Sequence, residues 1–195
     1  MRKACVKRQT KETSINVTLN IDGAGKGEVR TGIGFFDHMI ESFAKHGLFD
    51  ISMSVKGDLH VDQHHTIEDA GLSLGQAFDQ ALSARKGIAR AGCFLFPMDE
   101  ALAYCAIDLS GRPYVNIQCV FRSRKIGDLE CTVVEDFFQG FATALRVSLH
   151  IKILSGRSDH HKAEAMFKAF AKALYQACAI RSRARTVIPS TKGRI

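Results

Sequence analysis

Two His-His-x-x-Glu units carry the residue types of this sequence that are best suited to binding a metal ion. The units consist of His64, His65 and Glu68, and of His160, His161 and Glu164. Residues three and four apart share one face of a helix, so the glutamate of each unit can meet either imidazole. Adjacent imidazoles point about 100° apart, so a pair can give one ligand to each of two sites. The repeated unit therefore predicts two metal sites.

The ligand types indicate which ions these sites would take. Imidazole with carboxylate suits Mn, Fe, Co, Ni or Zn, and no cysteine lies nearby in the sequence to favour a closed structural zinc site. His38 in GFFDHM and His150 in SLHI have settings that could complete the set. Four ligands per site would leave about two positions of an octahedral ion for water or substrate. An isolated histidine pair would fit a helix cap equally well, but two pairs in register favour ligation.

A second group of residues has the chemistry for binding phosphate. Its members are Arg90 in GIARAG, Arg112 in SGRP, and Ser190, Thr191 and Lys192 in PSTKG. Arginine forks, lysine charge and backbone donors recognise phosphate oxygens. PSTKG lacks the Gly-x-x-x-x-Gly-Lys frame of a P-loop, and Gly-Arg-Pro is also compatible with a plain turn. Glu12, Asp99 and Glu100 are candidates for acid-base chemistry, although Glu12 is equally compatible with a solvated strand edge.

The two units occupy equivalent places in an internal repeat. A shift of 96 residues superposes His64 on His160 and Glu68 on Glu164. The apolar positions behind each unit also keep step, at the three- and four-residue spacing of an amphipathic helix. We therefore expect each unit to stand at the start of a helix, in the same structural context in both halves.

The elements around each unit predict the fold. Strand-like runs precede the units at 48–55 and 147–154, and helical patterns precede those runs at 35–46 and 133–145. Alternating strand-like runs open each half. The result is an α+β fold with two similar β-β-α-β-α halves, about 1–92 and 93–195. Because no linker separates the halves, we expect one pseudo-symmetric domain over 1–195.

Composition and charge narrow the class of protein further. The chain has 195 residues, is 46% hydrophobic and carries a formal charge of +7, which is typical of a globular domain with an anionic partner. It has no apolar run of about 18 residues, and its basic start lacks an apolar signal segment. Its six separated cysteines indicate free thiols in a reducing compartment. We expect a cytoplasmic protein without a membrane partner.

Several strings together match the order and spacing of a known family. They are RQTKET, TGIGFFDHM, GDLHVDQHHTIED, PMDEAL, DLSGRP, HHKAEAMFKAFAKAL and IPSTKG. On these strings the chain resembles imidazoleglycerol-phosphate dehydratase of histidine biosynthesis over nearly its whole length. The resemblance implies helices packed between two four-stranded mixed sheets, the ribosomal protein S5 domain 2-like fold. It also implies a homo-oligomer, a 24-mer with active sites at subunit interfaces.

The resemblance implies two Mn(II) ions per active site, with ligands from different subunits. A division that fits it places His38, His64, His160 and Glu164 on one ion, and His65, Glu68, His150 and His161 on the other. The implied reaction removes water from imidazole glycerol phosphate and gives imidazole acetol phosphate. The carbon that loses its proton has no neighbouring carbonyl, so a side-chain base alone, worth roughly 10²- to 10⁴-fold, is too little. Mn(II) on both ring nitrogens would hold the substrate as imidazolate and supply the missing electron sink.

Further roles follow from the positions of the matching motifs. Glu12 would be the proton-transferring carboxylate, with His38 and His46 among the other substrate contacts. The phosphate would be held by Arg90, Arg112, Lys168, Ser190 and Lys192, with Thr191 between the last two. Ser42, Ala91 and Ser158 depart from the family pattern. Since none of the three is an expected metal ligand, we expect them to affect fine specificity only.

Two other functions are compatible with parts of the sequence. A dinuclear site could activate hydroxide for phosphoester hydrolysis, although imidazole-rich ligation argues against this. The basic charge would also suit an RNA-binding or metal-storage protein, but the chain has no RNP-type aromatic motif, no KH-type clamp and no Trp. We therefore predict a hydro-lyase that acts on a small-molecule phosphate and has no nucleic-acid partner.

Overall fold

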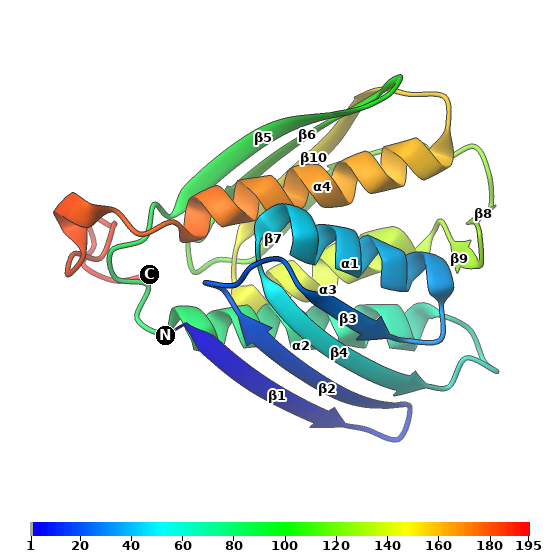
Figure 1. The fold of residues 1–195 in the computed structure, drawn as a ribbon, viewed down its shortest axis with the longest axis horizontal. Coiled ribbons are helices and arrows are strands. Elements are labelled where there is room, and N and C mark those ends of the chain that lie inside the picture. Colours follow the sequence, from blue (N-terminus) through cyan, green and yellow to red (C-terminus); the bar gives the residue numbers. More distant parts are fainter. Residues whose placement is uncertain (1) are drawn as a thin grey trace.

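Two four-stranded sheets enclose a layer of helices in this computed structural model, which describes residues 2–195 (Figure 1). The first sheet has the order β1 (Lys3–Gln9), β2 (Thr13–Asn20), β4 (Asp50–Gly57) and β3 (Gly27–Arg30). The second has the order β5 (Ala91–Met98), β6 (Ala101–Asp108), β10 (Ser148–Ser155) and β7 (Tyr114–Gln118). In each sheet the last pair is parallel and the other pairs are antiparallel. This repeated topology confirms the α+β fold with two similar halves.

The four helices between the sheets all start at the same end of the molecule (Figure 1). They are α1 (Gly34–Gly47), α2 (His64–Leu82), α3 (Val133–Leu145) and α4 (Asp159–Cys178). Smaller elements are β8 (Lys125–Ile126), β9 (Leu129–Glu130) and the 3₁₀ helix η1 (Ser182–Ala184). We call the end where the helices begin the helix-start end, and the opposite end, which carries the segment 179–195, the tail end. Among the described residues, no helix is both long and apolar enough to cross a bilayer.

Inward-facing apolar side chains of both halves form one buried cluster. On β2, the alternation of TSINVTLN buries Ile15, Val17 and Leu19, as expected for a strand with one face against helices. Phe43 of α1 and Phe170 of α4 stack with ring centroids 5.0 Å apart. Because helices from both halves interlock in this way, the ends of α1, α2, α3 and α4 are held at fixed relative positions.

Each four-stranded sheet takes three strands from before the first helix of its half, one more than in the predicted β-β-α-β-α unit, and the second half adds the two-residue strands β8 and β9. In the first half the additional strand is β3, a four-residue segment in which Val29 alone is buried. It is a strand because of its hydrogen bonds with β4. Its sequence has no alternation of apolar and polar residues that would predict this pairing. In the second half it is β5, which occupies the segment interpreted as the boundary between the halves. The predicted division between residues 92 and 93 therefore falls inside a strand.

Candidate active site

The second His-His-x-x-Glu unit begins α4 and meets α1 at the helix-start end. His38 of α1 and His160 and Glu164 of α4 each place a ligand atom within 4.8 Å of the other two. His160 Nε2 lies 3.3 Å from Glu164 Oε2, and His38 Nε2 lies 4.0 Å from Glu164 Oε1. The imidazoles are about half exposed, whereas the Glu164 side chain is 10% exposed. Three donors that converge on one solvent-open point form a candidate metal site.

Lys168 and His46 lie beside this cluster. Lys168 Nζ is 2.7 Å from Glu164 Oε1 and 5.5 Å from the centre of the Phe96 ring. Burial would raise the pKa of Glu164, but the hydrogen bond and charge of Lys168 lower it below its usual value. The His46 ring packs edge-on against Phe96, 5.2 Å between centroids, and burial together with the charge of Lys168 lowers the pKa of His46. Both expected substrate contacts thus adjoin the candidate metal ligands.

The first His-His-x-x-Glu unit begins α2 and brings in a carboxylate from α3. His64 Nε2 lies 3.9 Å from Glu68 Oε2, one helical turn onward. On its other side, His64 Nδ1 lies 3.0 Å from Asp136 Oδ2, in the first turn of α3. His64 therefore sits between two carboxylates, only one of which belongs to its own sequence unit.

His65 also has a carboxylate at each ring nitrogen. Its Nδ1 lies 3.1 Å from Asp58 Oδ2, and its Nε2 lies 3.8 Å from Glu12 Oε1. The hydrogen bond with Asp58 raises the pKa of His65, and the charge of Glu12 adds to the effect. Glu12 stands in the turn between β1 and β2 with its side chain 54% exposed. The structure thus brings Glu12 to the metal-ligand candidates, 53 residues away in sequence.

His161 repeats this arrangement in the second half. Its Nδ1 lies 2.7 Å from Glu100 Oε2, and its Nε2 lies 3.8 Å from Asp99 Oδ2. Glu100 also accepts hydrogen bonds from the backbone N–H groups of Arg157 and Ser158, at 3.2 and 2.8 Å. The bond with His161, followed by the backbone donors, lowers the pKa of Glu100 to about 2, and the same pairing raises the pKa of His161. Glu100, a candidate for acid-base chemistry on sequence, is fully engaged as a partner of this imidazole.

The hydrogen bonds at Nδ1 test whether these residues fit a metal. His64, His65 and His161 each have Nδ1 within 3.0, 3.1 and 2.7 Å of a carboxylate oxygen, respectively. A metal-binding imidazole commonly donates its other N–H to a carboxylate, which fixes the tautomer and the ring direction. In each of the three rings Nε2 then remains as the ligand atom. The donor set and its supporting carboxylates therefore fit divalent ions of the Mn(II) to Zn(II) type.

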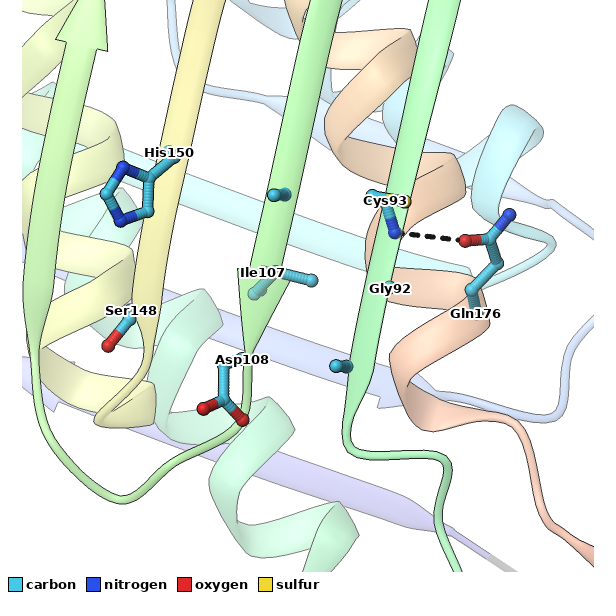
Figure 2. A pocket seen from close by; sticks show the side chains of 9 residues that line it. Gly92, Cys93, Ile107, Asp108, Ser148, His150 and Gln176 are labelled. Atoms are coloured by element: carbon cyan, nitrogen blue, oxygen red, sulfur yellow. Dashed lines mark hydrogen bonds between the residues drawn. The ribbon is translucent and has the colours of Figure 1, made fainter.

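His150 stands apart from these groups within the single chain. It alternates on β10 with Leu149 and Ile151, which are buried against the helices, so its own side chain points to the opposite face of the sheet. There it lines a hollow of about 450 Å³, with Ser148 and Asp108 (Figure 2). The structure does not bring His150 to the other expected ligands, so its assignment stays a prediction that requires a second subunit.

The expected phosphate residues gather at the tail end, with one exception. Arg90 makes a two-pronged ion pair with Asp108, at 2.8 and 3.1 Å, and donates a third hydrogen bond to the carbonyl of Pro189 at 2.8 Å. The next residues, Ser190 to Lys192, form a turn in which Ser190 Oγ accepts from the Lys192 N–H at 3.2 Å. This turn includes Thr191, so the PSTKG motif lies directly beside Arg90.

Arg112 belongs to the same end, whereas Lys168 does not. Gly111, beside Arg112, has φ +79° and packs so closely that an added Cβ would lie 2.9 Å from the backbone of Ile195. Arg112 is exposed next to the last residues of the chain. Lys168 instead contacts Glu164 in the metal cluster. One chain therefore presents most of the candidate metal ligands at the helix-start end and most of the expected phosphate residues at the tail end.

Sequence reasoning missed two carboxylates of this site. Asp136 and Asp58 contact His64 and His65 across 72 and 7 residues of sequence. Asp136 lies in a helical pattern that the analysis recognised, but helical periodicity does not show which helix start meets which. Asp58 follows a predicted strand as an ordinary loop residue. Their roles arise from the packing of α2 against α3 and from the chain path before α2.

Known proteins resemble this chain over almost its entire length. A model of the imidazoleglycerol-phosphate dehydratase family matches residues 31–174. Imidazoleglycerol-phosphate dehydratase of Koribacter versatilis is 54% identical over 193 residues, 99% of each chain. That of Lachnoclostridium phytofermentans is 54% identical over 194 residues, 100% of this chain and 98% of the relative.

Solved structures agree with the sequence relatives. The enzyme of that name from Pyrococcus furiosus superposes with a TM-score of 0.84 at 34% identity, covering 97% of this chain and 100% of that one. The Staphylococcus aureus enzyme gives a TM-score of 0.83 at 31% identity, covering 92% and 99%. Both share the fold described above.

Proposed function

Because the chain belongs to the imidazoleglycerol-phosphate dehydratase family, we propose that its two His-His-x-x-Glu units hold a pair of Mn(II) ions that activate the substrate's imidazole. The chain is a hydro-lyase of histidine biosynthesis. The reaction removes a proton and a hydroxide from neighbouring carbons of imidazole glycerol phosphate and releases them as water. The metal pair, the substrate contacts and the assembly are the parts proposed here.

The observation that carries the proposal is the carboxylate at Nδ1 of three imidazoles. His64, His65 and His161 are held by Asp136, Asp58 and Glu100 with Nε2 left to bind. His160 pairs with Glu164 through Nε2 at 3.3 Å and shares it with His38. When bound, the ions would hold the substrate ring as imidazolate, an electron sink for loss of the neighbouring proton. His38, His160 and Glu164 form one ligand group within a chain, and His64 joins it in this proposal from another copy.

Glu12 carries the proton in this proposal. Its carboxylate lies 3.8 Å from His65 Nε2, the atom that would bind a metal ion, and this proximity supports the role. Its side chain is 54% exposed, and among the described residues its carboxylate accepts no hydrogen bond. Glu12 therefore remains available to accept a proton. General-base transfer of this kind contributes about 10²- to 10⁴-fold to a rate.

The residues at the tail end would bind the substrate's phosphate. Asp108 fixes the guanidinium of Arg90. Its hydrogen bond raises the pKa of Arg90, and the opposing effect of burial is smaller. Exposed Arg112 and the turn at Ser190–Lys192 add a second cation fork and the charge of Lys192. These groups lie at the opposite end from the metal ligands, and the substrate is a single small molecule. The proposal therefore requires that neighbouring copies complete each site, as in a 24-mer.

The test of this proposal is dehydration assayed on protein stripped of metal and resupplied with Mn(II), with particle mass measured on the same samples. We expect imidazole acetol phosphate to form after Mn(II) is restored, and a large assembly to be present when it does. Turnover by the metal-free protein at the restored rate would overturn the metal assignment. Full activity in a monomeric fraction would overturn the shared site. The cytoplasm is the compartment in which we propose that this reaction takes place.

A further inference from the structure

We propose that Asp69 is a positioning residue for Glu12, acting through a chain of hydroxyl groups that fixes the β1–β2 turn against α2. This inference rests on the proposed role of Glu12 in proton transfer. Asp69 follows Glu68 in α2 and is buried, with no place among the expected metal ligands. A buried carboxylate one residue after a candidate ligand, directed toward β1 and β2, calls for a function of its own.

Three successive hydrogen bonds connect Asp69 to the turn, and a fourth joins the same carboxylate to Arg8 of β1. Thr13 Oγ1 donates to Asp69 Oδ2 at 2.5 Å, and Arg8 donates from Nε to Asp69 Oδ1 at 3.0 Å. Thr13 Oγ1 also lies 3.2 Å from Thr10 Oγ1. Thr10 Oγ1 in turn accepts from the backbone N–H of Glu12 at 3.1 Å. This series of hydrogen bonds therefore runs from the Asp69 carboxylate in α2 to the backbone of Glu12, the residue proposed to move the proton.

The charge of Asp69 sets the direction of the hydroxyl–hydroxyl hydrogen bond between Thr13 and Thr10. A carboxylate only accepts hydrogen bonds, so the Thr13 hydroxyl donates its single proton to Asp69. It must then accept a hydrogen bond from the Thr10 hydroxyl. Thr10 then donates its own proton to Thr13, and its lone pairs face the N–H groups of Glu12 and Thr13, at 3.1 and 2.9 Å. Replacing the carboxylate with an amide would introduce a competing donor and allow the order to reverse.

The same helix carries both the imidazole that Glu12 faces and the carboxylate that anchors its turn. His65 is the second residue of α2, and Asp69 lies four residues further on. A shift of the turn would alter the 3.8 Å separation between Glu12 Oε1 and His65 Nε2. Reaction rates are sensitive to a shift of the proton-transferring group, because this group must lie within hydrogen-bond reach of its target. Asp69 thereby ties the base to the metal-binding helix.

The test compares Thr13→Val with Thr13→Ser, because valine matches threonine in shape but lacks the hydroxyl, whereas serine keeps it. We expect Thr13→Val and Asp69→Asn to lower kcat at least tenfold, with KM and bound Mn(II) per chain within about twofold of wild type. Thr13→Ser should restore most of kcat. Thr18→Val, at an exposed position of the same strand, is the matched control.

A cycle with Glu12→Gln separates positioning from general structural support. If the hydrogen-bond series from Asp69 acts through Glu12, Thr13→Val should cause little further loss of kcat in the Glu12→Gln background. An equal fractional loss in both backgrounds, or an unchanged kcat in Thr13→Val, would overturn the inference. Wild-type activity in Glu12→Gln would instead overturn the proposed role of Glu12. A crystal structure of Thr13→Val should show the turn displaced from His65, and an unmoved turn would count against positioning.

Discussion

The carboxylate of Glu100 pairs with Nδ1 of His161, whereas Glu12 faces Nε2 of His65. The two glutamates stand on equivalent hairpins, β5–β6 and β1–β2, and a shift of 96 residues relates the histidines. In the first half Asp58 occupies Nδ1, which leaves Glu12 unengaged. In the second half Glu100 occupies Nδ1 itself, and its pKa falls to about 2. At Nε2 of His161 the position of Glu12 is taken by Asp99, also at 3.8 Å, so the two equivalent hairpins use their glutamates differently.

The first prediction concerns the contrast between these two glutamates. Glu12→Gln should lower kcat by about 10²- to 10⁴-fold while Mn(II) content stays normal, because only proton transfer is lost. Glu100→Gln should instead weaken Mn(II) binding by about 10- to 100-fold, because His161 loses its orienting carboxylate. Metal titrations followed by activity distinguish the two. A Glu100→Gln variant that stays inactive at saturating Mn(II) would contradict the division of roles.

The second prediction concerns Asp136, which sequence reasoning did not identify. Asp136→Asn should lower the affinity for one Mn(II) per chain by about 10- to 100-fold, since His64 would lose the partner of its Nδ1. Glu135→Gln, next to it on α3, is the matched control for loss of charge at this helix start. Metal content measured after dialysis against limiting Mn(II) checks it. Equal metal retention by both variants would show that Asp136 does not support His64.

The third prediction concerns the tail end. Arg112→Ala should raise KM while kcat changes little, because a charge-assisted hydrogen bond to the substrate worth about 1.5 to 3 kcal/mol is lost. At about 1.4 kcal/mol per factor of ten, this corresponds to a rise of roughly 10- to 150-fold. Steady-state kinetics with Arg124→Ala, an exposed arginine far from this end, as control would measure it. A normal KM would show that Arg112 does not bind the substrate and that the Gly-Arg-Pro string only forms a turn.

The fourth prediction concerns acid stability and the buried ion pair of Asp159. Burial would raise the pKa of Asp159, but Lys162 and the N–H groups of Ser123 and Arg122 lower it from 3.8 to about 2. Because the folded pKa is depressed, the stabilisation is complete above pH 3.8 and disappears as the pH falls through about 2. It amounts to roughly 2 kcal/mol.

Denaturant unfolding of metal-free protein between pH 2 and pH 6 would test this, with wild type compared with Asp159→Asn. The free energy of unfolding should differ most above pH 4 and converge towards pH 2. A difference that stays constant over the whole range would show that ionisation of Asp159 does not contribute.

The sequence was sufficient to predict the elements that hold the site. The amphipathic spacing behind His64 and His160 predicted α2 and α4, and the run at 133–145 matches α3 residue for residue. The periodicity of side chains within one element is local, so such patterns are visible without a structure. The short strand β3, with one buried residue, has no such pattern, and tertiary pairing alone defines it.

The partners of the candidate ligands were harder to predict for a related physical reason. Glu68 and Glu164 share a helix with their histidines, so spacing revealed them. Asp136 and Asp58 come from other segments, and their contacts depend on how helix starts converge. His150 shows the converse, because proximity in sequence to His160 suggested a shared site while strand alternation turned its side chain to the other face.

The measurement that bears most directly on the two-metal account is the stoichiometry of reactivation. Metal-free protein would be titrated with Mn(II) while formation of imidazole acetol phosphate and bound Mn(II) per chain are followed together. The account predicts that activity rises with binding and reaches its plateau when two ions are bound per chain. A plateau reached with one ion per chain, or turnover that needs no added metal, would contradict it.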